Sequence, residues 1–173
     1  MIVFPYKYVI IATIFILFVF RIYNFIRQRK ISVYNELLLL LIYIYSISVL
    51  YITVNPIILF DFGSTYKKIS LVPFKGIIDI LNEQGLKITL INVIGNFILF
   101  VPIGILMPIK YTTLTCRNII VIALFSSTLI EILQYIFSDR VSDIDDIIIN
   151  LSGAVIGYFL YKELKHRLNI HPL

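Results

Sequence analysis

The sequence predicts an all-α integral membrane protein, a polytopic helical bundle of about five transmembrane helices. Of its 173 residues 60% are hydrophobic and only 14% are charged, and the mean hydropathy is +0.96. Soluble domains contain roughly 45–50% apolar residues. The apolar residues also gather in runs close to the roughly 20 residues that cross a bilayer as a helix. We therefore expect one compact membrane domain rather than a soluble enzyme.

Five apolar runs give the predicted spans, and these are residues 9–20, 37–58, 88–109, 119–137 and 147–161. The first run lacks a small-residue cleavage signature, so we interpret it as a retained helix, lengthened by an earlier start or by tilt. The second run is expected to end near Asn55-Pro56, because proline disfavours helix at the residue before it.

Residues 61–87 contain three glycines and Pro73 among charged residues, so they are not expected to span the membrane. We predict an external loop that hugs the membrane surface. Apolar residues recur at helical spacing between positions 74 and 81, so this segment either forms a short interfacial helix or packs as a loop on the bundle. The predicted organisation is a two-helix N-terminal extension (1–60), this loop (61–87) and a three-helix core (88–162).

The positions of the basic residues predict the orientation. With the N-terminus outside, the cytoplasmic connections hold nine Lys and Arg residues and the external ones hold six. Basic residues concentrate on the cytoplasmic side, so N-out, C-in is expected. They flank the apolar runs and do not cluster on one polar face, so the net charge of +5 indicates topology rather than binding to nucleic acid.

Polar side chains in or beside the predicted spans are the main functional signal. A carboxylate costs roughly 2.5–3.5 kcal/mol at the centre of a membrane helix, so such groups are expected to face one another or a wet cavity. In the N-out orientation all of them lie in the external half of the membrane, which predicts a binding pocket that opens outward. These residues are Asn92, Asn96, Glu131, Gln134, Asp146 and Asn150.

Small residues and prolines in the same helices predict close packing. Gly153 and Gly157 form a small-xxx-small pattern, which lets another helix approach closely, on the stripe that carries Asn150. Pro102 and Gly104 are expected to bend the third span. Asn92 and Asn96 also fit a purely structural role, as interhelical hydrogen bonds.

The turn from Ser142 to Asp146 has two interpretations. Ser142 and Asp145 resemble a capping box, and carboxylates are favourable at a helix N-terminus, so the turn fits helix capping. Three aspartates exceed what capping requires, and Arg140 is positioned to neutralise one, so a cation or cationic ligand also fits. The single cysteine, Cys116, and the two histidines in the C-terminal tail have no metal-ligand spacing, and we expect no metal site and no cofactor.

Several motifs together resemble the VanZ-like family of small bacterial membrane proteins. In order and spacing they cover about residues 70–160. They are Leu71-Val-Pro73-Phe74, Asn92-x-x-Gly95-Asn96-Phe97-x-x-Phe100-x-Pro102-x-Gly104, Ser127-Thr-x-x-Glu131-x-x-Gln134 and Arg140-x-x-Asp143-x-Asp145-Asp146-x-x-x-Asn150-x-x-Gly153-x-x-x-Gly157.

The resemblance implies a multi-pass protein of the bacterial cytoplasmic membrane. The founding member of the family is associated with low-level resistance to teicoplanin-type glycopeptide antibiotics. The expected binding residues are Asn92, Asn96, Glu131, Gln134, Arg140, Asp143, Asp145, Asp146 and Asn150, and the expected structural residues are Pro73, Phe74, Pro102, Gly104, Gly153 and Gly157.

Three functions remain open from the sequence. The polar pocket would engage a lipid-linked peptidoglycan precursor, another lipid headgroup or a lipoglycopeptide. Alternatively, Glu131 would act as a general acid or base in a membrane enzyme acting on a lipid-linked substrate, with Ser126, Ser127 or Thr128 supplying a hydroxyl. In the third interpretation the polar residues only hold the helices together. Membrane lipids are the partners expected in every case.

Overall fold

The computed structural model describes residues 2–3, 33–54, 58–59, 69–137 and 141–167. The described part is built from four long helices, as the sequence predicts: α2 (Val33–Val54), α3 (Lys75–Lys110), α4 (Cys116–Phe137) and α5 (Ile144–Arg167). All four are long and apolar enough to cross a membrane. The described residues thus contain four such helices rather than five, because the predicted first span, residues 9–20, lies outside them, as does Arg140.

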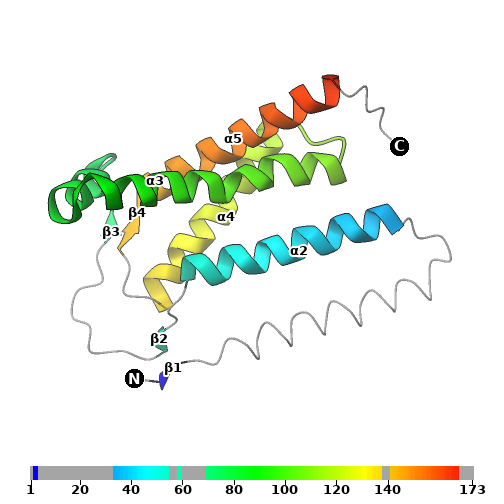
Figure 1. The fold of residues 1–173 in the computed structure, drawn as a ribbon. Helices are drawn as coiled ribbons and strands as arrows, with labels where there is room; N and C mark the ends of the chain where they lie inside the picture. The colour runs from blue at the N-terminus through cyan, green and yellow to red at the C-terminus, as the bar shows by residue number, and fades with distance from the viewer. Residues whose placement is uncertain (1, 4–32, 55–57, 60–68, 138–140, 168–173) are drawn as a thin grey trace.

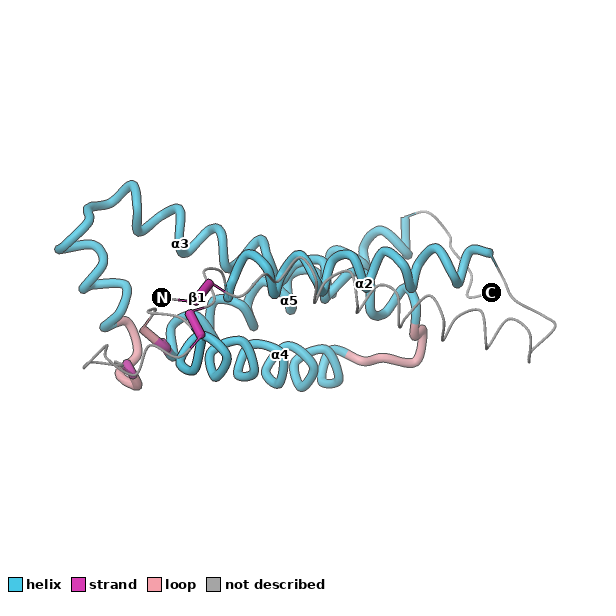
Figure 2. Tube along the Cα trace, turned by 90° about the horizontal axis from the view of Figure 1, so that it is seen from below, coloured by secondary structure: helices cyan, strands magenta, loops and turns pink. Residues whose placement is uncertain are grey.

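Helices α3 and α5 lie side by side (Figures 1 and 2). Helix α4 packs against α5, and α2 contacts α3 and α4. The side chains that fill the space between the helices are few, and many large apolar side chains on the outer faces are exposed, as expected where lipid replaces water. The buried apolar core consists of Val49, Phe100, Ile119, Ala123, Ile130 and Ala154.

Helix α3 begins before the predicted span at 88–109, and its first part matches the short-helix alternative for the segment between positions 74 and 81. Residues 75–84 are helical, and Gly85, with φ 81° and ψ 170°, separates this arm from the long arm that follows. The axis turns at that point (Figure 2). Glycine is the residue suited to this backbone region, which other residues reach only with strain. The glycines thus mark a turn between two helical arms rather than a continuous loop.

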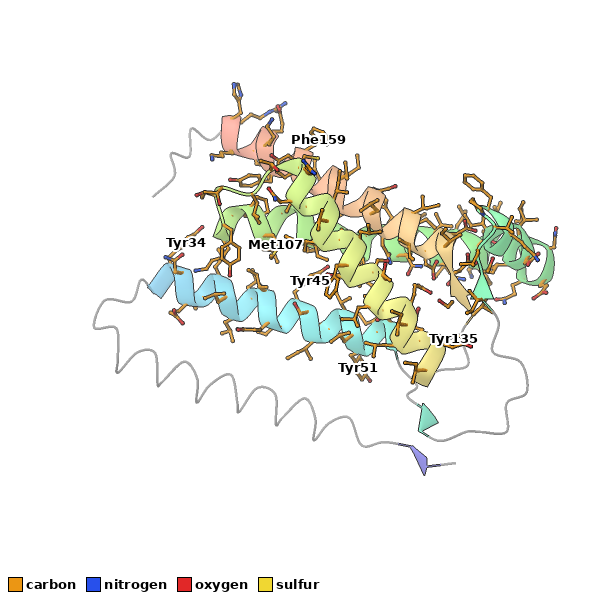
Figure 3. The ribbon with its side chains drawn as sticks, turned by 180° about the vertical axis from the view of Figure 1, so that it is seen from behind. Tyr34, Tyr45, Tyr51, Met107, Tyr135 and Phe159 are labelled. Atoms are coloured by element: carbon orange, nitrogen blue, oxygen red, sulfur yellow. The ribbon has the colours of Figure 1, made fainter. Side chains whose placement is uncertain are left out.

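Helix α3 continues through Pro102, which lies inside it. Proline has no backbone N–H, so it leaves a carbonyl of the preceding turn without its helical donor. The freed carbonyl is that of Ile98, four residues before the proline, and the hydroxyl of Tyr45, from α2, donates a hydrogen bond to the carbonyl oxygen of the next residue, Leu99. Tyr45 points from α2 toward the other helices (Figure 3). A neighbouring helix therefore supports the backbone beside the proline.

The helix ends follow local chemistry. Helix α2 stops at Val54, directly before Asn55-Pro56, as predicted. Helix α4 begins after Thr115, whose hydroxyl accepts the backbone N–H of Asn118, while the side-chain Oδ1 of Asn118 accepts the backbone N–H of Thr115 at 2.9 Å. This reciprocal pair is a capping box with asparagine in place of glutamate.

Two short strand pairs complete the described structure. β1 (Ile2–Val3) pairs antiparallel with β2 (Ile58–Leu59). β3 (Ile69–Ser70) pairs in parallel with β4 (Ser142–Asp143), in the register Ile69 to Ser142. The second pair ties the segment before α3 to the segment before α5, and so brings the Leu71–Phe74 turn next to the aspartate-rich turn.

Candidate functional site

The polar residues gather toward one end of the bundle, where the long arm of α3 that follows Gly85 meets the end of α4 and the start of α5. We call the following set the polar cluster: Asn96, Ser127, Glu131, Asp146 and Asn150. Glu131 and Asn150 are only 4% and 3% exposed, and Ser127 is fully buried. Asn96 and Asp146 are half-buried and form its rim.

Two hydrogen bonds hold the cluster together across helices. The Asn96 amide donates to Asp146 Oδ1 at 2.7 Å, which joins α3 to α5. The Asn150 amide donates to the Ser127 hydroxyl at 2.8 Å, which joins α5 to α4. The other atom of the Asn150 amide, Oδ1, is buried and has no hydrogen-bond partner among the described residues. Such an acceptor is costly to leave unpaired, and a bound donor would satisfy it.

Glu131 is positioned against the backbone of the aspartate-rich turn. Its Oε2 accepts the N–H of Asp143 at 2.9 Å, so the end of α4 is fixed to β4. The Asp143 carboxylate in turn accepts the N–H of Asp145 at 3.0 Å, at the start of α5. Burial raises the pKa of the Asp143 carboxyl, and the hydrogen bond from Asp145 opposes that rise.

Asp145 caps a different helix from its own. Its Oδ1 accepts the N–H of Phe74 at 2.6 Å and its Oδ2 accepts the N–H of Ile77 at 3.3 Å. Both N–H groups lie at the start of α3, where backbone donors have no acceptor within the helix. Phe74 adopts φ 67°, a left-handed conformation that is uncommon for a residue other than glycine. The buried carboxylate of Asp145 thus holds the turn at Pro73-Phe74, which is part of the Leu71-Val-Pro73-Phe74 motif.

Gly76 completes this junction, and sequence reasoning did not single it out. A Cβ placed on Gly76 would lie 1.4 Å from Asp143 Oδ2, so only glycine lets the carboxylate approach. The sequence offered one signal for it: a glycine in the first turn of a possible helix, three residues after Pro73, where the helix itself does not require glycine. Asp143 thus caps the start of α5 and Asp145 caps α3, so two of the three aspartates act in helix capping, through other partners than the predicted pair of Ser142 with Asp145.

Gln134 has a separate role from the polar cluster. Its amide donates to the carbonyl oxygen of Thr53 at 2.8 Å, at the last turn of α2. Because the last carbonyls of a helix lack helical partners, this contact caps α2 and attaches it to α4. Asn92 is exposed one turn before Asn96, and no hydrogen bond of its side chain is found in the described part of the chain.

The small residues form the contact between α3 and α5. A Cβ on Gly153 would lie 2.1 Å from the carbonyl oxygen of Phe97, and one on Gly157 would lie 2.1 Å from that of Val101. Gly104 meets the carbonyl oxygen of Ala154 in the same way, at 2.0 Å. The helix backbones therefore touch directly, which places Asn96 beside Asp146.

The cluster offers carboxylate and amide groups but no evident metal centre. Within residues 69–137 and 141–167 no group of three His, Cys, Asp or Glu side chains is placed to hold a metal ion. The chemistry that these residues supply is hydrogen bonding and negative charge, which suit hydroxyl, amide or ammonium groups of a ligand.

Fold and site together define a multi-pass helical membrane protein with a polar network at one end of the bundle. Residues 8–166 match the family model described as VanZ/LLP1, and the chain belongs to this family. It is 31% identical over 87 residues to Protein VanZ of Enterococcus faecium, in an alignment that covers 46% of this chain and 54% of that protein. The chain thus spans about half the length of the curated relative it matches. No solved structure matches.

Proposed function

We propose that this protein contributes to resistance against teicoplanin-type lipoglycopeptides from the bacterial cytoplasmic membrane. In this proposal the polar cluster faces the outer leaflet and binds a polar group there, on a lipid-linked peptidoglycan precursor or on the drug itself. The observation that carries the proposal is the buried, unpaired Oδ1 of Asn150, which lies one turn of α5 after Asp146 and on a side chain that contacts Ser127, one turn before Glu131, because it provides an unsatisfied acceptor near two carboxyl groups.

The distribution of charge supports the outward orientation. The end of the bundle opposite the polar cluster carries five basic residues in the described part of the chain, whereas the cluster's end carries Lys75 and Lys87. Basic residues mark the cytoplasmic side of a membrane protein. The five are Lys110, Arg117, Lys162, Lys165 and Arg167.

The rim of the cluster supports access from outside. Asn92 is exposed, and Asn96 and Asp146 are half-buried, so polar atoms lead from the surface toward Glu131. Beside them the turn at Leu71 and Phe74 exposes 71% and 63% of these apolar side chains. A ligand with a polar head and a hydrophobic tail matches a site with both kinds of surface.

The enzyme alternative has weaker support in this geometry. A serine nucleophile must reach both its base and its substrate. Ser127 is fully buried, and its hydroxyl accepts the Asn150 amide. This arrangement favours binding over nucleophilic catalysis through Ser127.

Antibiotic susceptibility of a sensitive Gram-positive host tests the proposal. The host expresses the native protein, Glu131→Gln or Asp146→Asn, with teicoplanin and vancomycin measured in parallel at matched membrane levels. We expect selective protection against teicoplanin by the native protein and its loss in both variants. Ser46→Ala, an exposed position on α2 far from the cluster, is the control and should protect fully.

Two results would overturn the proposal. One is full protection by Glu131→Gln and Asp146→Asn at normal membrane levels, which would leave the polar cluster a structural network. The other is no protection by the native protein, which would move the function to a substrate unrelated to these drugs.

A further inference from the structure

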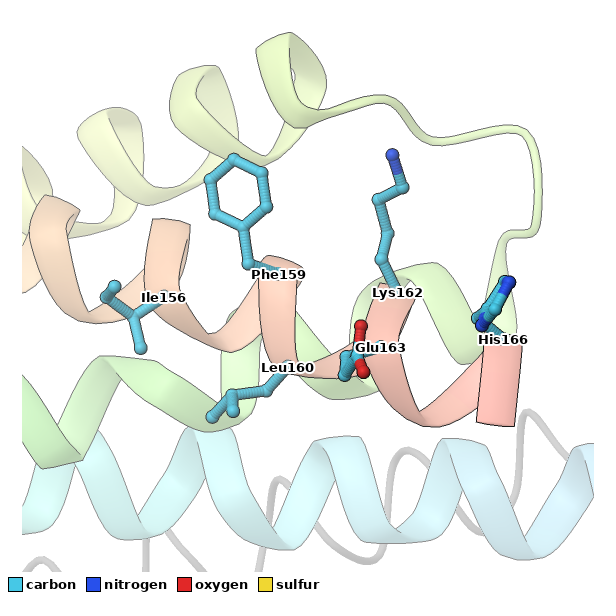
Figure 4. Close-up of a pocket in the computed structure, with 6 residues that line it drawn as sticks. All are labelled: Ile156, Phe159, Leu160, Lys162, Glu163 and His166. Atoms are coloured by element: carbon cyan, nitrogen blue, oxygen red, sulfur yellow. The ribbon is translucent and has the colours of Figure 1, made fainter. Parts of the chain in front are cut away.

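A shallow groove of about 570 Å³ lies along the C-terminal part of α5, at the end of the bundle opposite the polar cluster (Figure 4). Its apolar lining comes first along the helix, and its polar lining follows within the next two turns. Phe159 and Lys162 extend to the same side of α5. The lining residues are Ile156, Phe159, Leu160, Lys162, Glu163 and His166.

The order of these residues matches the depth profile of a membrane. Successive residues rise 1.5 Å along a helix, so Lys162 lies about 4.5 Å beyond Phe159 and His166 about 6 Å beyond Lys162. The apolar part therefore reaches acyl-chain depth when the polar part is at the headgroups. Lys162 and His166 are four residues apart and lie on one helix face.

The charge of this end is positive. In the described part of the chain this end carries five basic side chains and two carboxylates, Glu36 and Glu163. The Glu163 carboxylate, which lines the groove, is bound by Arg167 Nε at 2.7 Å, so its charge is balanced locally. Lys165 lies over the ring of Tyr161, 5.8 Å from its centroid. Lys162 is exposed, and within residues 141–167 no carboxylate is paired with it.

We propose that this groove binds one anionic phospholipid. Its acyl chain lies along Ile156, Phe159 and Leu160, and its phosphate is held by Lys162, with His166 one turn further out. Charge complementarity selects the headgroup, because a zwitterionic lipid brings its own cation next to Lys162. Basic pockets beside transmembrane helices are known to bind anionic headgroups in this way.

Native mass spectrometry of the full-length protein, purified in detergent, tests the site directly. Phosphatidylglycerol and phosphatidylcholine with identical acyl chains are titrated separately. We expect the native protein to bind phosphatidylglycerol more tightly, and Lys162→Gln to weaken this binding about fivefold while leaving phosphatidylcholine unchanged. Phe159→Ala should weaken both lipids, because it removes part of the acyl-chain contact.

Lys75→Gln is the matched control, since Lys75 is exposed at the other end of the bundle. It should bind both lipids as the native protein does, and all variants should melt at the native temperature. Equal binding of the two lipids by the native protein would overturn the proposal, as would an unchanged preference in Lys162→Gln.

Two further outcomes would assign the groove to another occupant. Equally tight binding of glycerophosphoglycerol, the headgroup without acyl chains, would indicate a phosphate site and contradict a lipid groove. A dimer that persists without lipid and is lost in Phe159→Ala would mean that a second copy of the chain covers the groove.

Discussion

The carboxylate of Asp145 accepts the backbone N–H of Phe74 across 71 residues of sequence, at 2.6 Å. It thereby fixes the turn before α3 to the first turn of α5. Because the Asp143 carboxylate lies against Gly76 in the same junction, the acidic turn and the start of α3 form one unit. Asp146, the next residue after Asp145, accepts the amide of Asn96 on α3.

Replacing Asp145 by alanine should lower the stability of the protein. The N–H groups of Phe74 and Ile77 would lose their acceptor, and a buried unpaired donor costs about 1–3 kcal/mol. Thermal unfolding of the purified protein in detergent measures the effect. Asp79→Ala, at an exposed position on the same arm of α3, should melt close to the native protein. Equal melting of the two variants would contradict the cap.

Gly153→Ala should separate α3 from α5. The new methyl group would lie 2.1 Å from the carbonyl oxygen of Phe97, so a backbone must move, at a cost typical of overpacking, about 1–3 kcal/mol. Gly95→Ala is the control because nothing lies within 4 Å of its Cβ position, and it should be neutral or stabilising by up to about 1 kcal/mol. A Gly153→Ala protein as stable as Gly95→Ala would show that the two helices do not touch there.

Gly85→Ala should destabilise the protein even though the space around it is open. No atom lies within 4 Å of a Cβ at this position, yet φ is 81°. A side chain in this backbone region costs about 1–3 kcal/mol. Amide hydrogen exchange should then become faster in residues 75–84, which depend on the turn. Exchange unchanged from the native protein would indicate that the two arms of α3 do not need this turn.

The pH dependence of stability should contain a contribution from Asp143. Burial raises the pKa of this carboxyl above its ordinary value of 3.8, so the folded protein binds the proton more tightly than the unfolded chain does. The free energy of unfolding contributed by this group therefore falls as pH rises from the ordinary value through the raised one, and it is constant above that. Asp143→Asn should gain stability relative to the native protein over this window. If the difference in stability between Asp143→Asn and the native protein did not change with pH, the raised pKa of Asp143 would be contradicted.

The long helices were predictable because each depends on a local apolar run. The end of α2 at Val54 follows from the neighbouring Asn55-Pro56, and the spans around α4 and α5 were found within a few residues. A short helix between positions 74 and 81 was one of two alternatives for the segment that begins α3, and the loop alternative rested on Pro73, Gly76 and Gly85. The first turn of α3 is stabilised by Asp145, a distant residue whose contact no local pattern reveals.

The sequence indicated which polar residues lie near one another, but not which contact each of them makes. Spacing and membrane depth brought Asn96, Glu131, Asp146 and Asn150 together as one group. The role of Gln134 as a cap for α2 depends on Thr53, 81 residues earlier, and was not visible in the sequence. The burial of Ser127 against Asn150 likewise depends on how α4 and α5 pack.

If the polar cluster faces the outside of the cell, cysteine labelling on intact cells will detect that end of the protein. In a Cys116→Ser background, Glu83→Cys reports the end with the polar cluster and Lys162→Cys reports the opposite end, both at exposed positions. With a membrane-impermeant maleimide, we expect Glu83→Cys to be labelled on intact cells and Lys162→Cys only after permeabilisation. Labelling of Lys162→Cys alone on intact cells would place the polar cluster in the cytoplasm and contradict the proposed orientation.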